Sequence, residues 1–119
     1  MSVLVLTDDL IFSSKIEAAA KALNQTLLLI SKPSQFDEAL KSAQISVALV
    51  DLHSFQDAAI ESVRRIRSRF PQARITGCCS HVQTELQRQA REAGCTWVLP
   101  RSVFVQQLPS LISGNAPEG

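Results

Sequence analysis

The sequence contains no strong excess of charge, no long apolar run and no disulfide framework. It has 12 Lys and Arg against 11 Asp and Glu, so the formal net charge of +1 favours neither nucleic acid nor an anionic membrane as a partner. No apolar stretch approaches the ~20 residues of a membrane-spanning helix, and no basic segment precedes the first apolar run. These absences predict a cytoplasmic protein that contacts neither nucleic acid nor a membrane.

The chain has only three cysteines, an odd number that leaves at least one thiol unpaired. All three lie in or beside predicted strands, where a reduced thiol packs as a small apolar side chain. The length of 119 residues fits one domain, and 45% hydrophobic residues are enough for a real core. We assign residues 1–112 to one domain. The polar segment 113–119, which contains Gly and Pro, is predicted to be a flexible tail.

Apolar runs alternate with apolar stripes at helical spacing along the chain. The runs predict strands at residues 3–6, 26–30, 45–50, 73–79 and 96–99. The stripes predict helices at residues 12–23, 36–40, 59–70, 82–90 and 103–112. Ser80 and Gln83 match a capping box before the fourth helix, and Gly94 is expected to end it. Because Pro109 is tolerated only in a first turn, the regular part of the last helix is expected to begin near Gln106.

Strands that alternate with helices predict βαβ units, which connect parallel strands by right-handed crossovers. The expected fold class is therefore α/β, a (βα)5 sandwich of the flavodoxin-like type with helices on both faces of one parallel sheet. In such sheets the ligand site lies at the carboxyl ends of the strands.

Three aspartates stand where two of the predicted strands end. Asp8 and Asp9 follow the run VLVL after one threonine, and Asp51 directly follows VALV. Because the carboxyl ends of parallel strands meet at one edge of a sheet, we expect the three carboxylates in one pocket. Carboxylates repel one another unless a cation lies between them, and Mg²⁺ is the natural partner for such oxygens. The alternative role of Asp9 is to cap the first helix.

The chain resembles the response-regulator receiver domain over nearly its whole length. The similarity is carried by the Asp8–Asp9 pair, by Asp51, and by the ending Ala93-Gly94-Cys95 through Leu99-Pro100-Arg101. The resemblance implies a five-stranded parallel sheet in the order 2-1-3-4-5. It also implies that Asp51 is the candidate phosphoacceptor, which attacks a phosphoryl donor to give an aspartyl phosphate while a metal ion neutralises the developing charge.

The resemblance also implies particular site residues. The metal ligands would be Asp8, Asp9, Asp51 and the backbone carbonyl of His53. A register shift of one residue would replace the acidic pair by Thr7 and Asp8. Arg101 stands in place of the family lysine that contacts the phosphoryl group, and it offers a planar fork instead of a point charge.

The chain departs from the family pattern at four places. The switch hydroxyl after the fourth strand falls on Cys78, Cys79 or Ser80, and only Ser80 carries a hydroxyl. Residues 52–58 lack the Met-Pro and Asp-Gly usual in that loop, and Ser102 replaces the proline that follows the family lysine. Val98 occupies the aromatic switch position, with Trp97 on the opposite face of the strand. This pattern is similar to degenerate, or pseudo-receiver, domains, which keep the fold and signal without phosphate.

The sequence therefore favours a stand-alone signalling module of a two-component (phosphorelay) pathway. It would bind signalling proteins through the surface around the last helix and fifth strand. The partners implied are a histidine kinase or a second copy of the chain. We predict no enzyme activity beyond self-phosphorylation at Asp51. The alternatives are an Mg²⁺-dependent hydrolase or phosphatase on the same fold, although Asp51-Leu52-His53 is not Asp-x-Asp, and a nucleotide-binding domain, although no Gly-rich phosphate loop follows the first strand.

Overall fold

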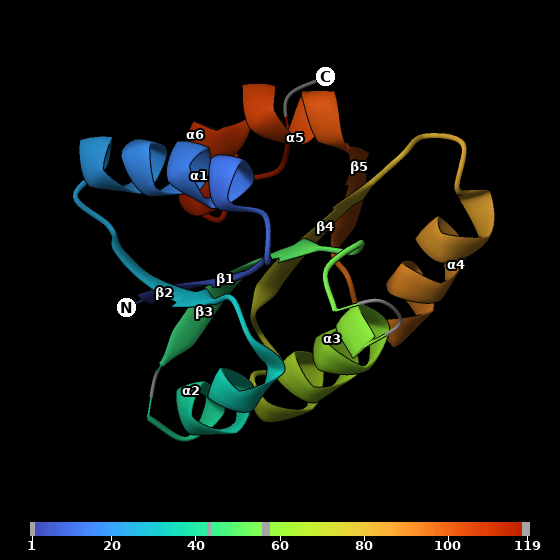
Figure 1. Ribbon diagram of the computed structural model, residues 1–119, viewed down its shortest axis with the longest axis horizontal. Coiled ribbons are helices and arrows are strands. Elements are labelled where there is room, and N and C mark those ends of the chain that lie inside the picture. The colour runs from blue at the N-terminus through green and yellow to red at the C-terminus, as the bar shows by residue number, and fades with distance from the viewer. Residues whose placement is uncertain (1, 43, 56–57, 118–119) are drawn as a thin grey trace.

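The computed structural model describes residues 2–42, 44–55 and 58–117. Five parallel strands form one sheet in the order β2-β1-β3-β4-β5, as predicted (Figure 1). The strands are β1 (Ser2–Leu6), β2 (Thr26–Ile30), β3 (Ile45–Asp51), β4 (Arg74–Cys79) and β5 (Trp97–Pro100). The apolar runs thus located each strand to within one residue at each end.

Helices cover both faces of the sheet (Figure 1). One face carries α1 (Leu10–Ala22), α5 (Arg101–Gln106) and α6 (Leu108–Ile112). The other carries the 3-10 turn η1 (Pro33–Gln35), α2 (Phe36–Ser42), α3 (Ala58–Arg69) and α4 (Thr84–Ala93). Because side chains alternate along a strand, each helix layer covers its own apolar core. Leu4 and Val50 belong to the core between the sheet and α3. Val5 and Leu49 belong to the core between the sheet and α1.

Helix ends differ from the predicted ones by up to three residues, and two predictions about helix ends were wrong. Ser80 and Gln83 do not form a capping box, because α4 begins only at Thr84; the Ser80 hydroxyl instead accepts a bond from the Val82 amide at 3.4 Å. The predicted last helix is two helices, α5 and α6, separated at Gln107. Pro109 lies in the first turn of α6, where its missing N–H leaves no helical hydrogen bond unmade. The prediction that this proline must lie in a first turn was correct, but the additional helix α5 precedes α6.

An arginine of α3 fixes the start of β5. The guanidinium of Arg67 donates two hydrogen bonds to the carbonyl of Gly94, at 2.8 and 3.1 Å, and one to the Thr96 hydroxyl at 3.2 Å. Gly94 ends α4 with a φ of 126°, and a Cβ there would lie 2.8 Å from Cγ of Arg67. A glycine is therefore needed both for the backbone conformation and for this close approach.

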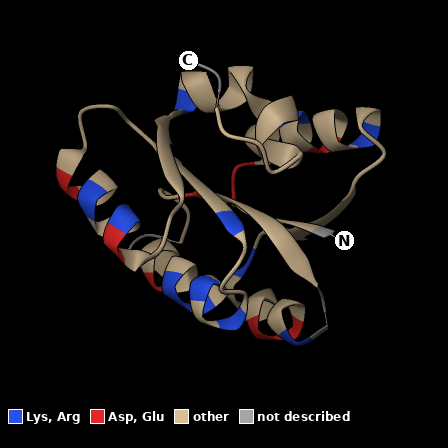
Figure 2. Cartoon of the chain, turned by 180° about the vertical axis from the view of Figure 1, so that it is seen from behind, with Lys and Arg blue, Asp and Glu red and all other residues tan. Residues whose placement is uncertain are grey.

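Charged residues gather on the layer formed by α2, α3 and α4 (Figure 2). Several are paired across or along helices: Arg65 with Asp37, Arg64 with Glu61, and Arg88 with Glu85 and Glu92. Such exposed pairs contribute little to stability, of the order of 0–1 kcal/mol each. Within the described residues, no helix is both long and apolar enough to cross a membrane.

The predicted tail begins with an ordered turn. The backbone amides of Ser113, Gly114 and Asn115 donate to carbonyls of α6, so the first residues of the segment 113–119 complete that helix. The rest of the tail prediction, at residues 118 and 119, lies outside the described residues, as do residues 56 and 57 of the loop after β3.

Candidate functional site

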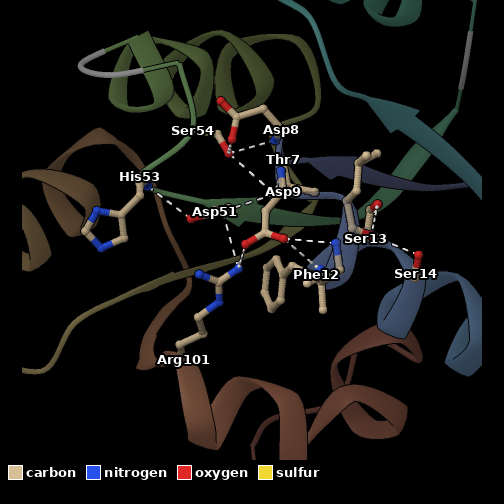
Figure 3. Close-up of polar contacts among 12 residues, drawn as sticks. Thr7, Asp8, Asp9, Phe12, Ser13, Ser14, Asp51, His53, Ser54 and Arg101 are labelled. Carbon is tan, nitrogen blue, oxygen red and sulfur yellow. Dashed lines mark hydrogen bonds and ion pairs between the residues drawn. The ribbon is translucent and has the colours of Figure 1, made fainter.

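Three chain segments meet at the carboxyl edge of the sheet (Figure 3). The first is Thr7-Asp8-Asp9, which connects β1 to α1, and the second is Asp51, the last residue of β3. The third is Arg101, which begins α5 directly after β5. The three aspartates therefore lie at the sheet edge where the sequence predicted them, because the strands that they end or follow have their carboxyl ends at this edge.

Asp51 is the buried centre of this group, with 4% of its surface exposed. Its Oδ2 accepts a hydrogen bond from the Thr7 hydroxyl at 3.0 Å, and its Oδ1 accepts one from the backbone amide of His53 at 3.1 Å. Nη2 of Arg101 lies 3.9 Å from Oδ2. The buried carboxylate thus has two neutral donors and one cation around it, as a buried charge requires.

Asp9 is both a helix cap and a partner of Arg101. Its Oδ1 accepts hydrogen bonds from the backbone amides of Ile11 and Phe12, both at 3.0 Å, which caps α1. Its Oδ2 accepts a 2.7 Å hydrogen bond from Nη2 of Arg101. The amide of Phe12, followed by the Arg101 guanidinium, lowers the pKa of this carboxyl. The two roles that the sequence left open for Asp9, cap and site residue, therefore coexist.

Asp8 is directed away from the other two carboxylates, toward the loop after β3 (Figure 3). Its Oδ1 accepts from the Ser54 hydroxyl at 3.2 Å and its Oδ2 from the Phe55 amide at 3.4 Å. The Asp8 amide in turn donates to the Ser54 oxygen at 2.9 Å. Ser54, a fully buried residue, was not predicted. One serine in a polar loop gives no sequence signal that it contacts a residue 46 positions away.

The expectation that Asp8, Asp9 and Asp51 surround one metal ion is not met by this arrangement. Among the residues that the structure describes, no three His, Cys, Asp or Glu side chains are grouped so that they could hold a metal. The physical reason is that Arg101 and local donors already use the carboxylate oxygens. The amide N–H of His53 donates to Asp51, and the role predicted for its carbonyl stays a prediction. The residues as arranged do not fit Mg²⁺, which requires several oxygens at about 2.0–2.1 Å from one point.

The three candidates for the switch position, Cys78, Cys79 and Ser80, lie at the end of β4 or directly after it. Cys78 is the β4 residue paired with Asp51 in the strand ladder. Burial, and then the charge of Asp51, raise the pKa of the Cys78 thiol, so it stays protonated and unreactive. Ser80 lies beyond the end of β4, and no hydrogen bond among the described residues joins it to Asp51. Val98 packs against the core on the opposite face of the sheet from α1.

Solved structures share this fold, although no protein-family model and no curated protein matches the chain. A response regulator from Burkholderia pseudomallei, crystallised with a phosphorylated aspartic acid and a calcium ion, has a TM-score of 0.81 at 16% identity. The match covers 93% of this chain, which spans only 65% of that one. A receiver domain protein from Methanospirillum hungatei has a TM-score of 0.82 at 12% identity, covering 95% of this chain and 90% of that one. A response regulator from Thermotoga maritima has a TM-score of 0.79 at 17% identity, and the match covers 95% of this chain and 94% of that one. The chain therefore has the fold of response-regulator receiver domains.

The lowered pKa of Asp9 predicts a defined pH dependence. A carboxyl whose folded pKa lies below its unfolded value stabilises the fold above the unfolded pKa, about 3.9 for Asp, and loses this contribution as the pH falls through the folded pKa. Asp9→Asn keeps a capping side chain but removes the charge. We expect wild type to be more stable than Asp9→Asn at pH 7 and the difference to disappear as the pH falls through the lowered pKa of Asp9.

Urea denaturation of both proteins between pH 7 and pH 2.5 measures this difference. The same pair in an Arg101→Met background is the control. There the difference should shrink because Arg101 is one of the causes of the shift. A stability difference that stays constant over the whole pH range would contradict the prediction.

Proposed function

We propose that the chain is a receiver-like signalling module that acts by binding other proteins of a phosphorelay pathway. The observation that carries this proposal is the position of Asp51. Asp51 is a buried acid at the end of the central strand β3, in a chain that has the fold of receiver domains. Arg101, which follows β5, is the cation beside it. A fold alone does not define a function, and it is the pairing of a buried Asp51 with a nearby cation that supports the signalling role.

We further propose that the module is degenerate, so that phosphate at Asp51 has little effect on partner binding. A ligand shifts an equilibrium between two states only by its differential affinity for them. Here the candidate hydroxyl of Ser80 is not bonded to Asp51, the aromatic position is Val98, and Arg101 is already paired with Asp9. A phosphoryl group would therefore find few contacts that differ between an inactive and an active state.

The surface that we propose for partner binding includes α5 and the beginning of α1. Leu10 and Ile11 are 77% and 75% exposed, and neighbouring large apolar side chains in such positions are typical of interaction sites. A groove of about 550 Å³ beside them lies between α1 and α5 and is lined by Phe12 and Val105 among others. We propose a signalling protein, such as a histidine kinase, as the partner of this surface.

The hydrolase alternative is less consistent with the geometry. A general acid or base must lie within hydrogen-bond reach of the reacting group. The groups bonded to Asp51 are the Thr7 hydroxyl and the His53 amide, and Arg101 is the next neighbour. The His53 imidazole points away from the three acids (Figure 3).

The test compares partner binding by wild type, Asp51→Asn and Ile11→Asp. The partner is first identified by affinity enrichment with each protein as bait, and its Kd is then measured by titration with and without a small phosphodonor. We expect wild type and Asp51→Asn to bind with Kd values within about tenfold, or ~1.4 kcal/mol. Ile11→Asp, which places a charge in the exposed apolar pair, should lose binding.

Two outcomes would contradict the proposal. A gain in affinity well above tenfold after phosphodonor treatment of wild type, absent in Asp51→Asn, would restore an ordinary phosphate-driven switch. Equal binding by Ile11→Asp would show that the partner uses another surface. The intact mass of each protein after phosphodonor treatment is measured as the control, because it gives the fraction of molecules that carry a phosphoryl group in each titration.

A further inference from the structure

The carboxylates at the acidic edge of the sheet already have hydrogen-bond donors from the protein itself. Every carboxylate oxygen of its three aspartates accepts at least one hydrogen bond. For Asp51 the donors are Thr7 and His53, for Asp9 they are the α1 amides and Arg101, and for Asp8 they are Ser54 and Phe55. An ion that bound here would have to replace some of these bonds as well as lose its own water.

Arg101 lies between the two acids that come from different strands. The same nitrogen, Nη2, is 2.7 Å from Oδ2 of Asp9 and 3.9 Å from Oδ2 of Asp51. The guanidinium carbon lies 4.2 Å from the centre of the Phe12 ring, and an arginine is attracted to such a ring face. Asp9, Asp51 and Phe12 thus hold the guanidinium in one position (Figure 3).

A divalent ion and this guanidinium compete for the same oxygens. Mg²⁺ binds at about 2.0–2.1 Å and gives up its water reluctantly, so it needs free carboxylate oxygens that face one point. Oδ2 of Asp9 and Oδ2 of Asp51 face Nη2 of Arg101 instead. Since two cations at one point repel each other, the ion enters only if Arg101 moves out.

We propose that Arg101 is the resident cation of this site and excludes Mg²⁺ from Asp9 and Asp51. Removal of the guanidinium frees Oδ2 of Asp9 and removes the cation that faces Oδ2 of Asp51, so that the variant gains a divalent-metal site that the wild type lacks. The inference goes beyond the proposed function: it concerns the acidic edge alone, and holds whether or not the chain binds a signalling partner.

The experiment measures Mg²⁺ binding by wild type, Arg101→Met and a control. Arg64→Met is the matched control, since Arg64 is an exposed arginine on α3 paired only locally with Glu61. The melting temperature is recorded with about 10 mM MgCl₂ and with NaCl of equal ionic strength. Trp97 is the one tryptophan of the chain and begins β5, the strand that leads to Arg101, so its fluorescence is a second measure of the titration.

We expect no saturable Mg²⁺ response from wild type or from Arg64→Met. For Arg101→Met we expect a rise in melting temperature of about 4 °C or more, the size expected when the ion is at roughly ten times its Kd, with a saturable change in Trp97 fluorescence. The double variant Arg101→Met/Asp9→Asn should lose most of this gain, because it neutralises the carboxylate that removal of Arg101 frees.

The proposal is overturned if wild type binds Mg²⁺ with a saturable signal and a higher melting temperature. It is equally overturned if Arg101→Met folds, as judged by circular dichroism, and gives no response. Should Arg101→Met not fold, Arg101→Gln replaces it in the same comparison, and the wild-type titration alone still tests the exclusion. Neither result depends on a partner protein, so this test and that of the proposed function fail separately.

Discussion

Phe104→Ala is expected to lower the free energy of unfolding by about 3–5 kcal/mol. Phe104 of α5 is fully buried and packs against Phe12 of α1, with ring centroids 5.4 Å apart. Truncation removes the transfer free energy of the ring and leaves a cavity in the core between α1, α5 and the sheet. Because the stability of a domain this size is only about 5–15 kcal/mol, the loss is a large fraction of the total.

Urea denaturation measures this loss, and Phe104→Leu is the matched control. Leucine keeps most of the buried volume, so its cost should stay well below that of alanine, at less than about 1.5 kcal/mol. A loss under about 1 kcal/mol for alanine would show that α5 is not fixed by this contact. Since α5 begins at Arg101, weaker packing of Phe104 should also weaken the pairing of Arg101 with Asp9.

Thr7→Val is expected to cost about 1–3 kcal/mol, although the two side chains have nearly the same shape. The Thr7 hydroxyl, on a residue that is 1% exposed, donates to the buried carboxylate of Asp51 and accepts from the amide of Asp9. Valine leaves both groups without that partner. The expected cost is therefore that of an unsatisfied buried acceptor and donor.

A double-mutant cycle with Asp51→Asn tests the cause of this effect. The cost of Thr7→Val should be smaller in the Asp51→Asn background, because a neutral amide loses less than a charged carboxylate when its donor is removed. Thr7→Ser, which retains the hydroxyl, is the control and should cost less than Thr7→Val. Equal costs of Thr7→Val in both backgrounds would show that Asp51 does not depend on this hydroxyl.

Much of the architecture could be predicted because it depends on local pattern. The apolar runs before Asp8 and Asp51 define two strands, and alternation of strands and helices defines a parallel sheet. The carboxyl ends of such strands share one edge, so the sequence also predicted that Asp8, Asp9 and Asp51 would lie there. Asp9 and Asp51 face one arginine at this edge, whereas Asp8 is bonded to the loop after β3. The boundaries that failed, at Ser80 and after Gln106, depend on weak capping signals that tertiary packing overrides.

The sequence by itself determined the parallel sheet and the edge at which the acids lie, and its resemblance to receiver domains implied the strand order. Only the tertiary structure decided which donor meets which oxygen. Arg101 reaches Asp9 across 92 positions, and Ser54 reaches Asp8 across 46. These bonds depend on strand register, on the start of α5 and on side-chain rotamers at once, none of which a spacing in the sequence specifies. Two of the three acids that predict a metal site from the sequence, Asp9 and Asp51, therefore face an arginine of the chain in the fold, while Asp8 is bonded to Ser54.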